Sequence, residues 1–364
     1  MQTNSINDLN NMVDSEKYTK ISVLMACYNV ERYIGIALDS VLVQTYPHFE
    51  VLCVDDCSSD DTLNILEDYC KKDERIKVFR NSENLGITKT KNVLLSLAMN
   101  ETVVFLDGDD ISDIHRFEKL LHCKNLYNAD IVSSAYTLIG SSGQKLKTRG
   151  LQLLTTKMGI RYTSFFNSPI PHAPSMINRS LIEDRGGYKE DYIAAEDYDL
   201  FVDILLQKEV IVKILPCPLY LYRINEDGIS RSYNKSQIES HIKIAKKFIL
   251  KELSTDPENF HYWNLSKYED TVKIYPYSFL NTALNQINYI RKTYLNKYSV
   301  SSAERQEIND YTSQYYIFTY LCMLRNGIKY NQVIKVSALI TVSFVRNFFL
   351  IFNLSTFKWI RKQI

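Results

Sequence analysis

The chain has 364 residues, of which 45% are hydrophobic and 23% charged, with a formal net charge of +1. This composition is typical of a folded globular protein and excludes a largely disordered chain. A net charge so close to zero gives no electrostatic reason for a nucleic-acid partner, and none is expected. The seven cysteines are scattered and form no CxxC pair, which indicates a reducing cytoplasm without a disulfide framework or a zinc site.

Strands and helices are predicted to alternate from residue 21 onward. Apolar runs typical of strands stand at 21–26, 49–54, 76–79 and 102–106. Apolar residues at helical spacing fill the intervals 31–44, 62–69 and 84–99. Alternation with short connections predicts a parallel α/β sheet, in which ligands bind outside the carboxyl ends of the strands.

Three of these predicted strand ends carry polar side chains. They are Tyr28 with Asn29, Asp55 with Asp56, and Asp107 with Asp109 and Asp110. Neither a GxGxxG motif nor a P-loop follows the first strand. We therefore predict a nucleotide-type site in which carboxylates, rather than a glycine loop, bind the ligand.

The acidic turn after the fourth strand has two interpretations. Like charges this close together repel one another, and burying an unpaired anion is costly. A bound Mn²⁺ or Mg²⁺ would relieve the repulsion, since both ions take oxygen ligands. The alternative is a solvated acidic turn before a helix, with Asp110 or Ser112 as the N-cap.

Four motifs in this order resemble glycosyltransferase family 2. They are Ser22-Val23…Tyr28-Asn29, Val54-Asp55-Asp56-Cys57-Ser58…Asp60, Asn84-Leu85-Gly86…Lys91-Asn92 and Phe105-Leu106-Asp107-Gly108-Asp109-Asp110. The resemblance implies an α/β GT-A fold, a Rossmann-like mixed, mainly parallel sheet with flanking helices, plus a C-terminal helical region. The matched region implies a catalytic domain over 20–233. Residues 1–19, which are rich in Asn, Asp and Ser, are predicted to be a flexible tail, and 234–364 a helical region.

The resemblance also implies a binding site for a nucleotide-sugar donor. Asp56 would accept the uracil N3–H, because a carboxylate only accepts hydrogen bonds, while Ala26 and Tyr28 would hold the base. The full set implied is Ala26, Tyr28, Asn29, Asp56, Asn84, Gly86, Lys91, Asp107, Asp109 and Arg223. The alternative for Asp55 and Asp56 is capping of the next helix, and for Lys91 it is a solvated helix face.

Metal binding and catalysis are assigned by the same resemblance. Asp109 and Asp110 would hold Mn²⁺ or Mg²⁺ against the diphosphate, and Asn225 stands where relatives often have a metal-binding histidine. Asp197 would be the general base, with Glu196 as its neighbour, although acids in a first helical turn often only complement the helix dipole. His172, in a proline-broken loop, would contact the acceptor or be structural.

The segment from 234 onward lacks strand signals and is predicted to be helical. After Asp310 it contains no acidic residue, and basic residues flank an aromatic-rich run at 342–352 that Arg346 and Asn347 interrupt. The interruption argues against a transmembrane helix and favours a helix in the membrane interface. The alternative is an ordinary helical subdomain or a dimer face.

The sequence thus predicts an inverting glycosyltransferase that moves a sugar from a UDP-sugar to a glycan or lipid-linked acceptor. Surface polysaccharide synthesis would suit a cytoplasmic enzyme held peripherally on the inner face of the membrane. No QxxRW motif is present, which favours single additions. The alternatives are a nucleotidyltransferase, or a catalytically inactive module that binds sugar nucleotides.

Overall fold

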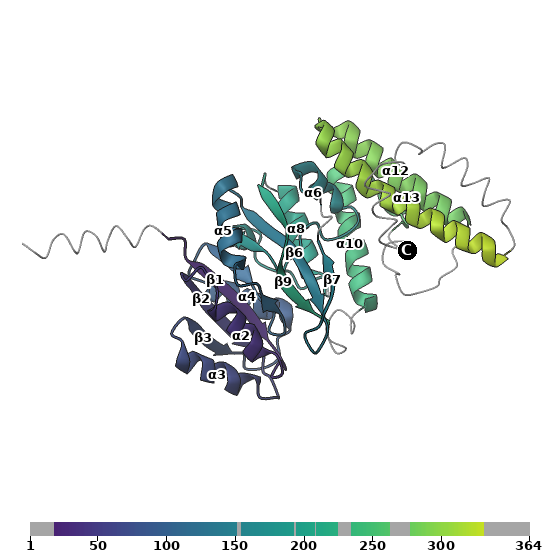
Figure 1. Ribbon diagram of the computed structural model, residues 1–364. Coiled ribbons are helices and arrows are strands. Elements are labelled where there is room, and N and C mark those ends of the chain that lie inside the picture. Colours follow the sequence, from purple (N-terminus) through teal and green to yellow (C-terminus); the bar gives the residue numbers. More distant parts are fainter. Residues whose placement is uncertain are drawn as a thin grey trace, which may run out of the picture. The chain divides into compact units, whose positions relative to one another are not determined.

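The computed structural model describes most of the chain. The described residues are 18–150, 154–192, 194–207, 209–224, 234–262 and 277–330, with side chains as far as 316 in the last helix. They form two compact units (Figure 1): unit 1 contains 18–150 and 170–237, and unit 2 contains 154–169 and the chain from 238 on. The predicted domain border at 233 stays a prediction.

The first half of unit 1 is the predicted alternation of strand and helix. The strands are β1 (Ile21–Cys27), β2 (Phe49–Asp55), β3 (Ile76–Arg80) and β4 (Thr102–Phe105). The helices between them are α2 (Ile34–Leu42), α3 (Thr62–Lys72) and α4 (Ile87–Leu97). The strands lie in the order β3-β2-β1-β4 and pair in parallel, because each is connected to the next by a crossover helix.

The second half of unit 1 extends this sheet with antiparallel pairs and with one parallel pair, between β6 and β9. Its strands are β5 (Ile111–Ser112), β6 (Ile131–Ile139), β7 (Lys145–Arg149), β8 (Met176–Asn178) and β9 (Val212–Arg223). Its helices are α5 (Arg116–Tyr127), α7 (Arg179–Glu183) and α8 (Glu196–Gln207). The order continues from β4 as β8-β6-β9-β5, with β7 paired antiparallel to β6. The result is the predicted mixed α/β sheet with flanking helices.

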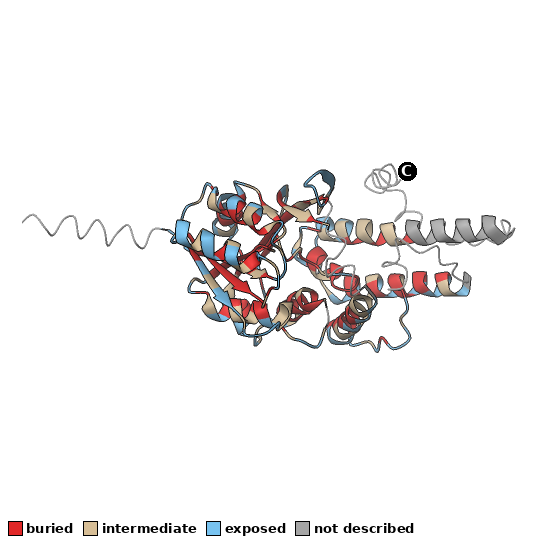
Figure 2. Ribbon diagram, turned by 90° about the horizontal axis from the view of Figure 1, so that it is seen from below, coloured by how far each residue is buried: buried red, intermediate tan, exposed pale blue. Residues whose placement is uncertain are grey.

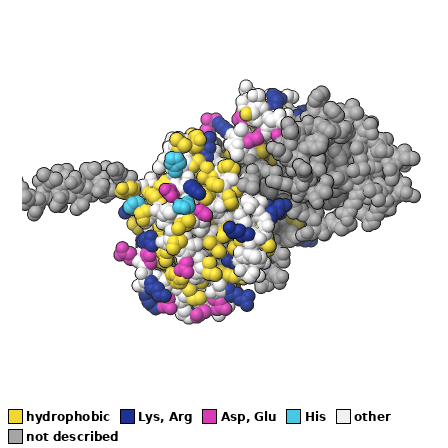
Figure 3. Space-filling model, in the orientation of Figure 1, with side chains coloured by type: hydrophobic (Ala, Val, Ile, Leu, Met, Phe, Trp, Pro, Cys, Tyr) yellow, Lys and Arg dark blue, Asp and Glu magenta, His cyan; other side chains and the backbone are white. Residues whose placement is uncertain are grey.

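Burial of the strands holds unit 1 together. Alternate residues of β1, such as Val23 and Met25, pack with Ile34 and Leu38 of α2 and with Phe117 of α5 in one apolar cluster. Figure 2 shows the strands of this unit as mostly buried and the helices as exposed along one side. On the face seen in Figure 3, acidic and basic side chains are interspersed among apolar ones.

The strand register brings the predicted site residues to one edge of the sheet. Cys27, the last residue of β1, lies opposite Asp55, the last residue of β2. Phe105, the last residue of β4, lies opposite Leu24, and the chain continues past it with the Leu106 amide bonded to the Leu24 carbonyl at 3.1 Å. The turns after β1, β2 and β4 are therefore neighbours.

Unit 2 is helical and has an aromatic core. It contains α6 (Lys157–Thr163), most of α10 (Asn234–Leu253), α12 (Tyr277–Lys297) and α13 (Ser302–Tyr330). Tyr162, Phe165 and Tyr294 are fully buried, and their ring centroids lie 5.4 to 5.7 Å apart. Many tyrosines of this region are thus core residues. Within the described residues, no helix is both long and apolar enough to cross a membrane, and the run at 342–352 lies outside them.

Candidate active site

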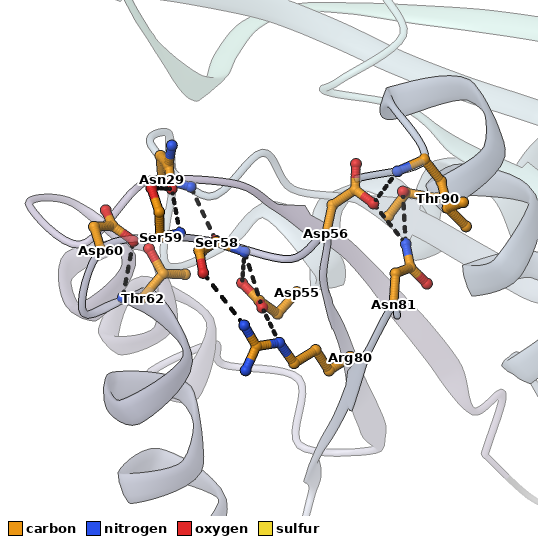
Figure 4. Close-up of polar contacts among 11 residues, drawn as sticks. Asn29, Asp55, Asp56, Ser58, Ser59, Asp60, Thr62, Arg80, Asn81 and Thr90 are labelled. Carbon is orange, nitrogen blue, oxygen red and sulfur yellow. Dashed lines mark hydrogen bonds and ion pairs between the residues drawn. The ribbon is translucent and has the colours of Figure 1, made fainter. Parts of the chain in front are cut away.

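The two carboxylates after β2 point in different directions and have different partners (Figure 4). Asp55 is fully buried, accepts a hydrogen bond from the Ser58 amide at 3.2 Å and pairs with Arg80 at 3.4 Å. Neither Asp55 nor Asp56 caps α3; instead Asp60 accepts the Thr62 amide at 3.1 Å at the start of that helix. The capping alternative for Asp55 and Asp56 is therefore wrong.

Asp56 holds the N-terminal turn of α4. One carboxylate oxygen accepts the Asn81 side-chain amide at 2.7 Å and the Leu85 amide at 2.8 Å, and the other accepts the Gly86 amide at 2.8 Å. Gly86 has φ +81°, a left-handed conformation that turns its N–H toward the carboxylate at little cost for glycine. A carboxylate offers about four acceptor positions, so one remains for a further N–H donor.

The turn after β1 is tied to the turn after β2. Asn29, at φ +50°, accepts the Ser59 amide at 2.9 Å, and its own amide donates to the Ser58 hydroxyl at 3.0 Å. Tyr28 is 48% exposed beside these contacts, and Ala26 is half-buried. Asn84 lies on the surface and accepts the Gly86 amide at 3.1 Å. Asn29 therefore fixes the turn after β1 against the turn after β2, while the exposed Tyr28 presents a ring that a base can stack on.

The acidic turn after β4 is buried rather than solvated. Asp110 is 1% exposed; one of its oxygens accepts the Arg223 amide at 2.6 Å, and the other has no hydrogen-bond partner among the described residues. Ser112 belongs to β5, and α5 begins only at Arg116. The interpretation of Asp110 or Ser112 as the N-cap of a following helix is therefore wrong.

The glycine inside the acidic turn permits a close approach to α2. A Cβ on Gly108 would stand 3.0 Å from Val30 and 3.4 Å from Ile34. Those contacts are tighter than ordinary van der Waals contacts. The turn can therefore press against the apolar cluster only because this position lacks a side chain, which explains the glycine of the motif.

The charges of the acidic turn are poorly compensated by the protein. Burial raises the pKa of Asp110 well above its usual range, and the charges of Asp107 and Asp109 raise it further, although hydrogen bonds from the Arg223 amide and from Tyr220 act in the opposite direction. Burial also raises the pKa of Asp107, against the charge of Lys91. An orphaned, buried carboxylate oxygen beside further acids fits a hard divalent cation. Among the described residues no cluster of three His, Cys, Asp or Glu side chains is arranged to hold a metal, and Asn225 lies outside them.

Arg223 joins the acidic turn to the sheet. Its guanidinium donates to the Asp109 carbonyl at 2.7 Å and to the Gly140 carbonyl at 3.0 Å, and it lies 4.4 Å from the Tyr33 ring centroid. Its backbone amide holds Asp110. The side chain thus has protein partners, and its predicted contact with the donor nucleotide stays a prediction.

A second buried arginine was missed by the sequence analysis. Arg116 is fully buried beneath the acidic turn, donates to the Phe105 carbonyl at 2.9 Å and to the Ala173 carbonyl at 2.7 Å, and lies 4.9 Å from the Tyr220 ring centroid. Burial lowers its pKa to about 10, although Tyr220, Asp110 and Asp107 act in the opposite direction. The sequence feature that could have indicated a buried arginine is its position within the apolar pattern of α5.

The predicted catalytic acids open helix α8. Leu200, Phe201 and Ile204 are buried and anchor the helix in unit 1. Asp197 is half-buried and accepts the Tyr198 amide at 2.7 Å, whereas Glu196 is buried and receives the Lys91 ammonium at 2.6 Å. Glu196 therefore has a specific partner beyond the helix dipole. Just before the helix, Ala194 adopts φ +52°, and its carbonyl accepts the Gln237 side-chain amide at 2.9 Å.

His172 is buried and neutral. Its Nε2 lies 2.6 Å from the Tyr188 hydroxyl, and its ring centroid lies 4.2 Å from that of Phe105. Burial and, to a lesser extent, the Lys91 charge hold its pKa well below the usual range. The predicted contact of His172 with the acceptor stays a prediction, since the described partners are all apolar or phenolic neighbours.

Comparison with known proteins places this geometry in context. Residues 22–186 match the model of a family described as glycosyl transferase family 2. An uncharacterized glycosyltransferase of Haemophilus influenzae is 28% identical over 296 residues, which cover 78% of this chain and 88% of that protein. Poly(ribitol-phosphate) β-N-acetylglucosaminyltransferase TarS of Staphylococcus aureus is 28% identical over 248 residues, which cover 66% of this chain and 42% of that protein.

Two solved structures share the fold. The structure of S. aureus TarS residues 1–349 in complex with UDP-GlcNAc aligns with a TM-score of 0.54 at 20% identity, covering 86% of this chain and 92% of that one. The mannosyltransferase PcManGT of Pyrobaculum calidifontis, in complex with GDP-Man and Mn²⁺, aligns with a TM-score of 0.51 at 15% identity. That alignment covers 94% of this chain and 84% of the mannosyltransferase. Both comparisons support the GT-A fold.

Proposed function

We propose that this chain, which matches the glycosyl transferase family 2 model over residues 22–186, is a member of that family that transfers a sugar from a UDP-sugar to a glycan or lipid-linked acceptor of a bacterial surface polysaccharide. The observation that carries the site assignment is a buried oxygen of Asp110 that has no hydrogen-bond partner among the described residues, in a turn with two further acids. Structural neighbours hold nucleotide sugars, one of them with Mn²⁺. The relatives are named glycosyltransferases, which does not favour the nucleotidyltransferase alternative.

In this proposal the residues that bind the donor and the metal have separate roles. The remaining acceptor position of Asp56 takes the uracil N3–H, Tyr28 stacks on the base, and Asp107 binds the ribose. Asp109 and Asp110 hold Mn²⁺ or Mg²⁺, which when bound neutralises charge on the leaving diphosphate. Asp110 is suited to this because its free oxygen cannot reach water in the buried turn.

Sugar transfer needs only the acceptor, the UDP-sugar and a base that takes the acceptor proton. Asp197 takes the proton of the acceptor hydroxyl as that oxygen forms a bond to the anomeric carbon. The bond between the anomeric carbon and the diphosphate oxygen breaks, its electron pair stays on the diphosphate oxygen, and UDP leaves. Attack from the face opposite the diphosphate inverts the anomeric configuration. Asp197 is half-buried on a rigid helix, so it can reach the acceptor and still keep a fixed direction.

Donor choice is tested with a panel of UDP-sugars and GDP-mannose in the presence of Mn²⁺ or Mg²⁺. We expect one UDP-sugar to raise Tm and to be slowly hydrolysed; saturation at 100 times Kd stabilises the fold by about 2.7 kcal/mol. Chelation of the metal should remove both effects. If GDP-mannose alone stabilises the protein, or no sugar nucleotide does, the proposed donor is wrong. Binding without hydrolysis or transfer would favour the inactive module.

We also propose that the C-terminal segment binds the inner face of the cytoplasmic membrane. Its support is the sequence after Asp310, which is basic and aromatic without a single acidic residue. Truncation after Asn331, which leaves all of α13, should abolish cosedimentation with liposomes rich in anionic lipid and leave donor hydrolysis unchanged. Liposomes of zwitterionic lipid provide the control. Undiminished binding of the truncated chain would contradict the proposal.

A further inference from the structure

We propose that Lys91 is a positioning residue for the general base Asp197, and that it acts through Glu196 rather than by binding the donor. The inference rests on the proposed function, because it assumes that Asp197 takes the acceptor proton. Lys91 lies in the second turn of α4, and Glu196 is the first residue of α8. The two helices are far apart in sequence, and this ion pair connects them.

The pair is short and buried. The Lys91 Nζ lies 2.6 Å from the Glu196 Oε1, the residues are 105 positions apart, and their side chains are 11% and 8% exposed. Exposed ion pairs contribute little, but removing one partner of a buried pair leaves an uncompensated charge, which is strongly unfavourable. The first turn of α8 is therefore held at a defined distance from α4, and Asp197 is the next residue in that turn.

Lys91 is the shared cation of three carboxylates. Its charge interacts with Glu196, Asp107 and Asp197, and its Nζ lies 5.5 Å from the Tyr188 ring centroid. Burial alone would lower the pKa of Lys91, but these acids outweigh burial and raise it. Burial alone would raise the pKa of Glu196, and Lys91 reverses that shift as well. Both groups stay charged, so the pair persists at neutral pH.

Helix α4 is fixed at both the donor side and the acceptor side. Its first turn is held by Asp56, the predicted uracil acceptor, through the Leu85 and Gly86 amides. The side chain of Asn92 donates to the Tyr188 carbonyl at 2.9 Å and accepts the Tyr188 amide at 2.8 Å. Contacts of α4 and of the two residues before it thus run from Asp56 to the loop before α8, and Lys91 adds the contact to the first residue of α8.

The ammonium of Lys91 is committed to Glu196, which argues against a role on the diphosphate. To bind phosphate, Lys91 would have to break its 2.6 Å ion pair with Glu196, and the buried Glu196 carboxylate would then lose this cation. The two roles give opposite kinetic results. A positioning residue changes kcat and leaves donor affinity intact, whereas a phosphate ligand changes the affinity for UDP.

The test compares Lys91→Met, Glu196→Gln, the double variant and the charge-reversed pair Lys91→Glu with Glu196→Lys. Each single change should lower kcat about 100-fold, the cost of a misplacement of about 1 Å. The Kd for UDP with Mn²⁺, measured by calorimetry, should change by less than about threefold, because the Asp109–Asp110 turn is untouched. The kcat of the double variant should be no lower than that of either single variant, because each of the three variants loses the same Lys91–Glu196 interaction. The reversed pair should recover at least about tenfold of the lost kcat.

The pH dependence of kcat provides a further test, because a purely structural role of Lys91 would not shift it. The groups that interact with Glu196 are Lys91 from α4, Asp107 from the acidic turn and Tyr188 from the loop before α8, and Lys91 and Tyr188 also interact with Asp197. Arg185, in the same loop, acts on Tyr188 and pairs with Asp199 and Asp203. Lys91 is the nearest cation in this set, and its loss makes deprotonation of the neighbouring acids harder. The acid limb of the kcat profile should therefore move to higher pH in Lys91→Met and stay in place in Lys91→Arg.

Lys89→Met is the matched control. Lys89 lies on the same helix and pairs with Glu190 at 3.5 Å, but both side chains are about half exposed, so kcat should be unchanged. A UDP affinity reduced more than tenfold in Lys91→Met, or additive losses in the double variant, would overturn the inference. If the wild-type chain transfers sugar and Asp197→Asn does not, but the Lys91 variants are fully active, the inference alone fails. If no UDP-sugar is turned over by the wild type, the proposed function fails.

Discussion

Replacement of Asp110 by asparagine is expected to lower metal-dependent kcat by roughly 10³-fold while making the metal-free protein more stable. The two effects have one cause. Asp110 is buried with one oxygen lacking a partner among the described residues, so its negative charge is useful only to a bound cation. Without a cation this charge destabilises the fold, and the neutral amide removes the penalty.

The direction of the pKa shift of Asp110 determines how its effect on stability depends on pH. Burial and the neighbouring acids raise the pKa of Asp110 in the folded protein. The native state therefore binds this proton more tightly than the unfolded state, and stability is lost as the pH rises through the folded pKa. The Tm gain of Asp110→Asn in the absence of metal should accordingly be larger at pH 8 than at pH 5.

The measurement is a thermal melt with and without Mn²⁺, together with the rate of UDP release. Mn²⁺ should stabilise the wild type and leave Asp110→Asn unchanged. Asp68→Asn, the same chemical change at an exposed carboxylate paired with Lys71, should alter neither melting nor turnover. A fall in metal-free Tm for Asp110→Asn, or a retained response to Mn²⁺, would show that this carboxylate has a structural role instead.

Replacement of Asp197 by asparagine is expected to reduce kcat for transfer by roughly 10²- to 10⁴-fold, the usual contribution of a general base. Asparagine keeps the side-chain oxygen that accepts the Tyr198 amide, so the first turn of α8 should be preserved. The Kd for UDP and the metal response should stay at the wild-type values, because the donor is bound by other residues.

This result is measured with the donor identified by the panel and an acceptor extract, together with calorimetry of UDP. Asp191→Asn is the control, since Asp191 is an exposed carboxylate six positions earlier in the chain. It should leave transfer unchanged. An Asp197→Asn variant that keeps more than about a tenth of the wild-type kcat would exclude this residue as the base.

Much of unit 1 could be predicted because its first half is built from local patterns. Apolar runs and helical spacing between residues 21 and 106 are enough to define β1 to β4 and the helices between them. The parallel arrangement then places Asp55, Asp56 and the acidic turn at one edge, as the register shows. The short strand β5 and helix α5 have weaker patterns and were not predicted.

The partners of the charged residues could not be predicted, because a linear pattern shows that a charge is present but not what it faces. Lys91 and Arg223 were both expected at the donor nucleotide, and the structure shows them bonded to Glu196 and to backbone carbonyls. These contacts join residues far apart in the chain: Lys91 and Glu196 are 105 positions apart, and Arg223 is 114 positions from Asp109 and 83 from Gly140. Arg116 was missed for the same reason, since its partners lie in β4 and in the proline loop.

The contact between Arg223 and Asp110 bears on when the site is completed during synthesis. Strands β1 to β4 and their helices need only the first third of the chain, and pairings such as Ile21 with Thr102 lie within it. Asp110 receives its backbone donor from a residue 113 positions later, at the end of β9. Closing so long a loop is entropically costly and is rewarded only when β9 pairs with β6. A ribosome-bound chain that ends before β9 thus has the sheet core and the acidic motif, but not the folded turn that positions its carboxylates.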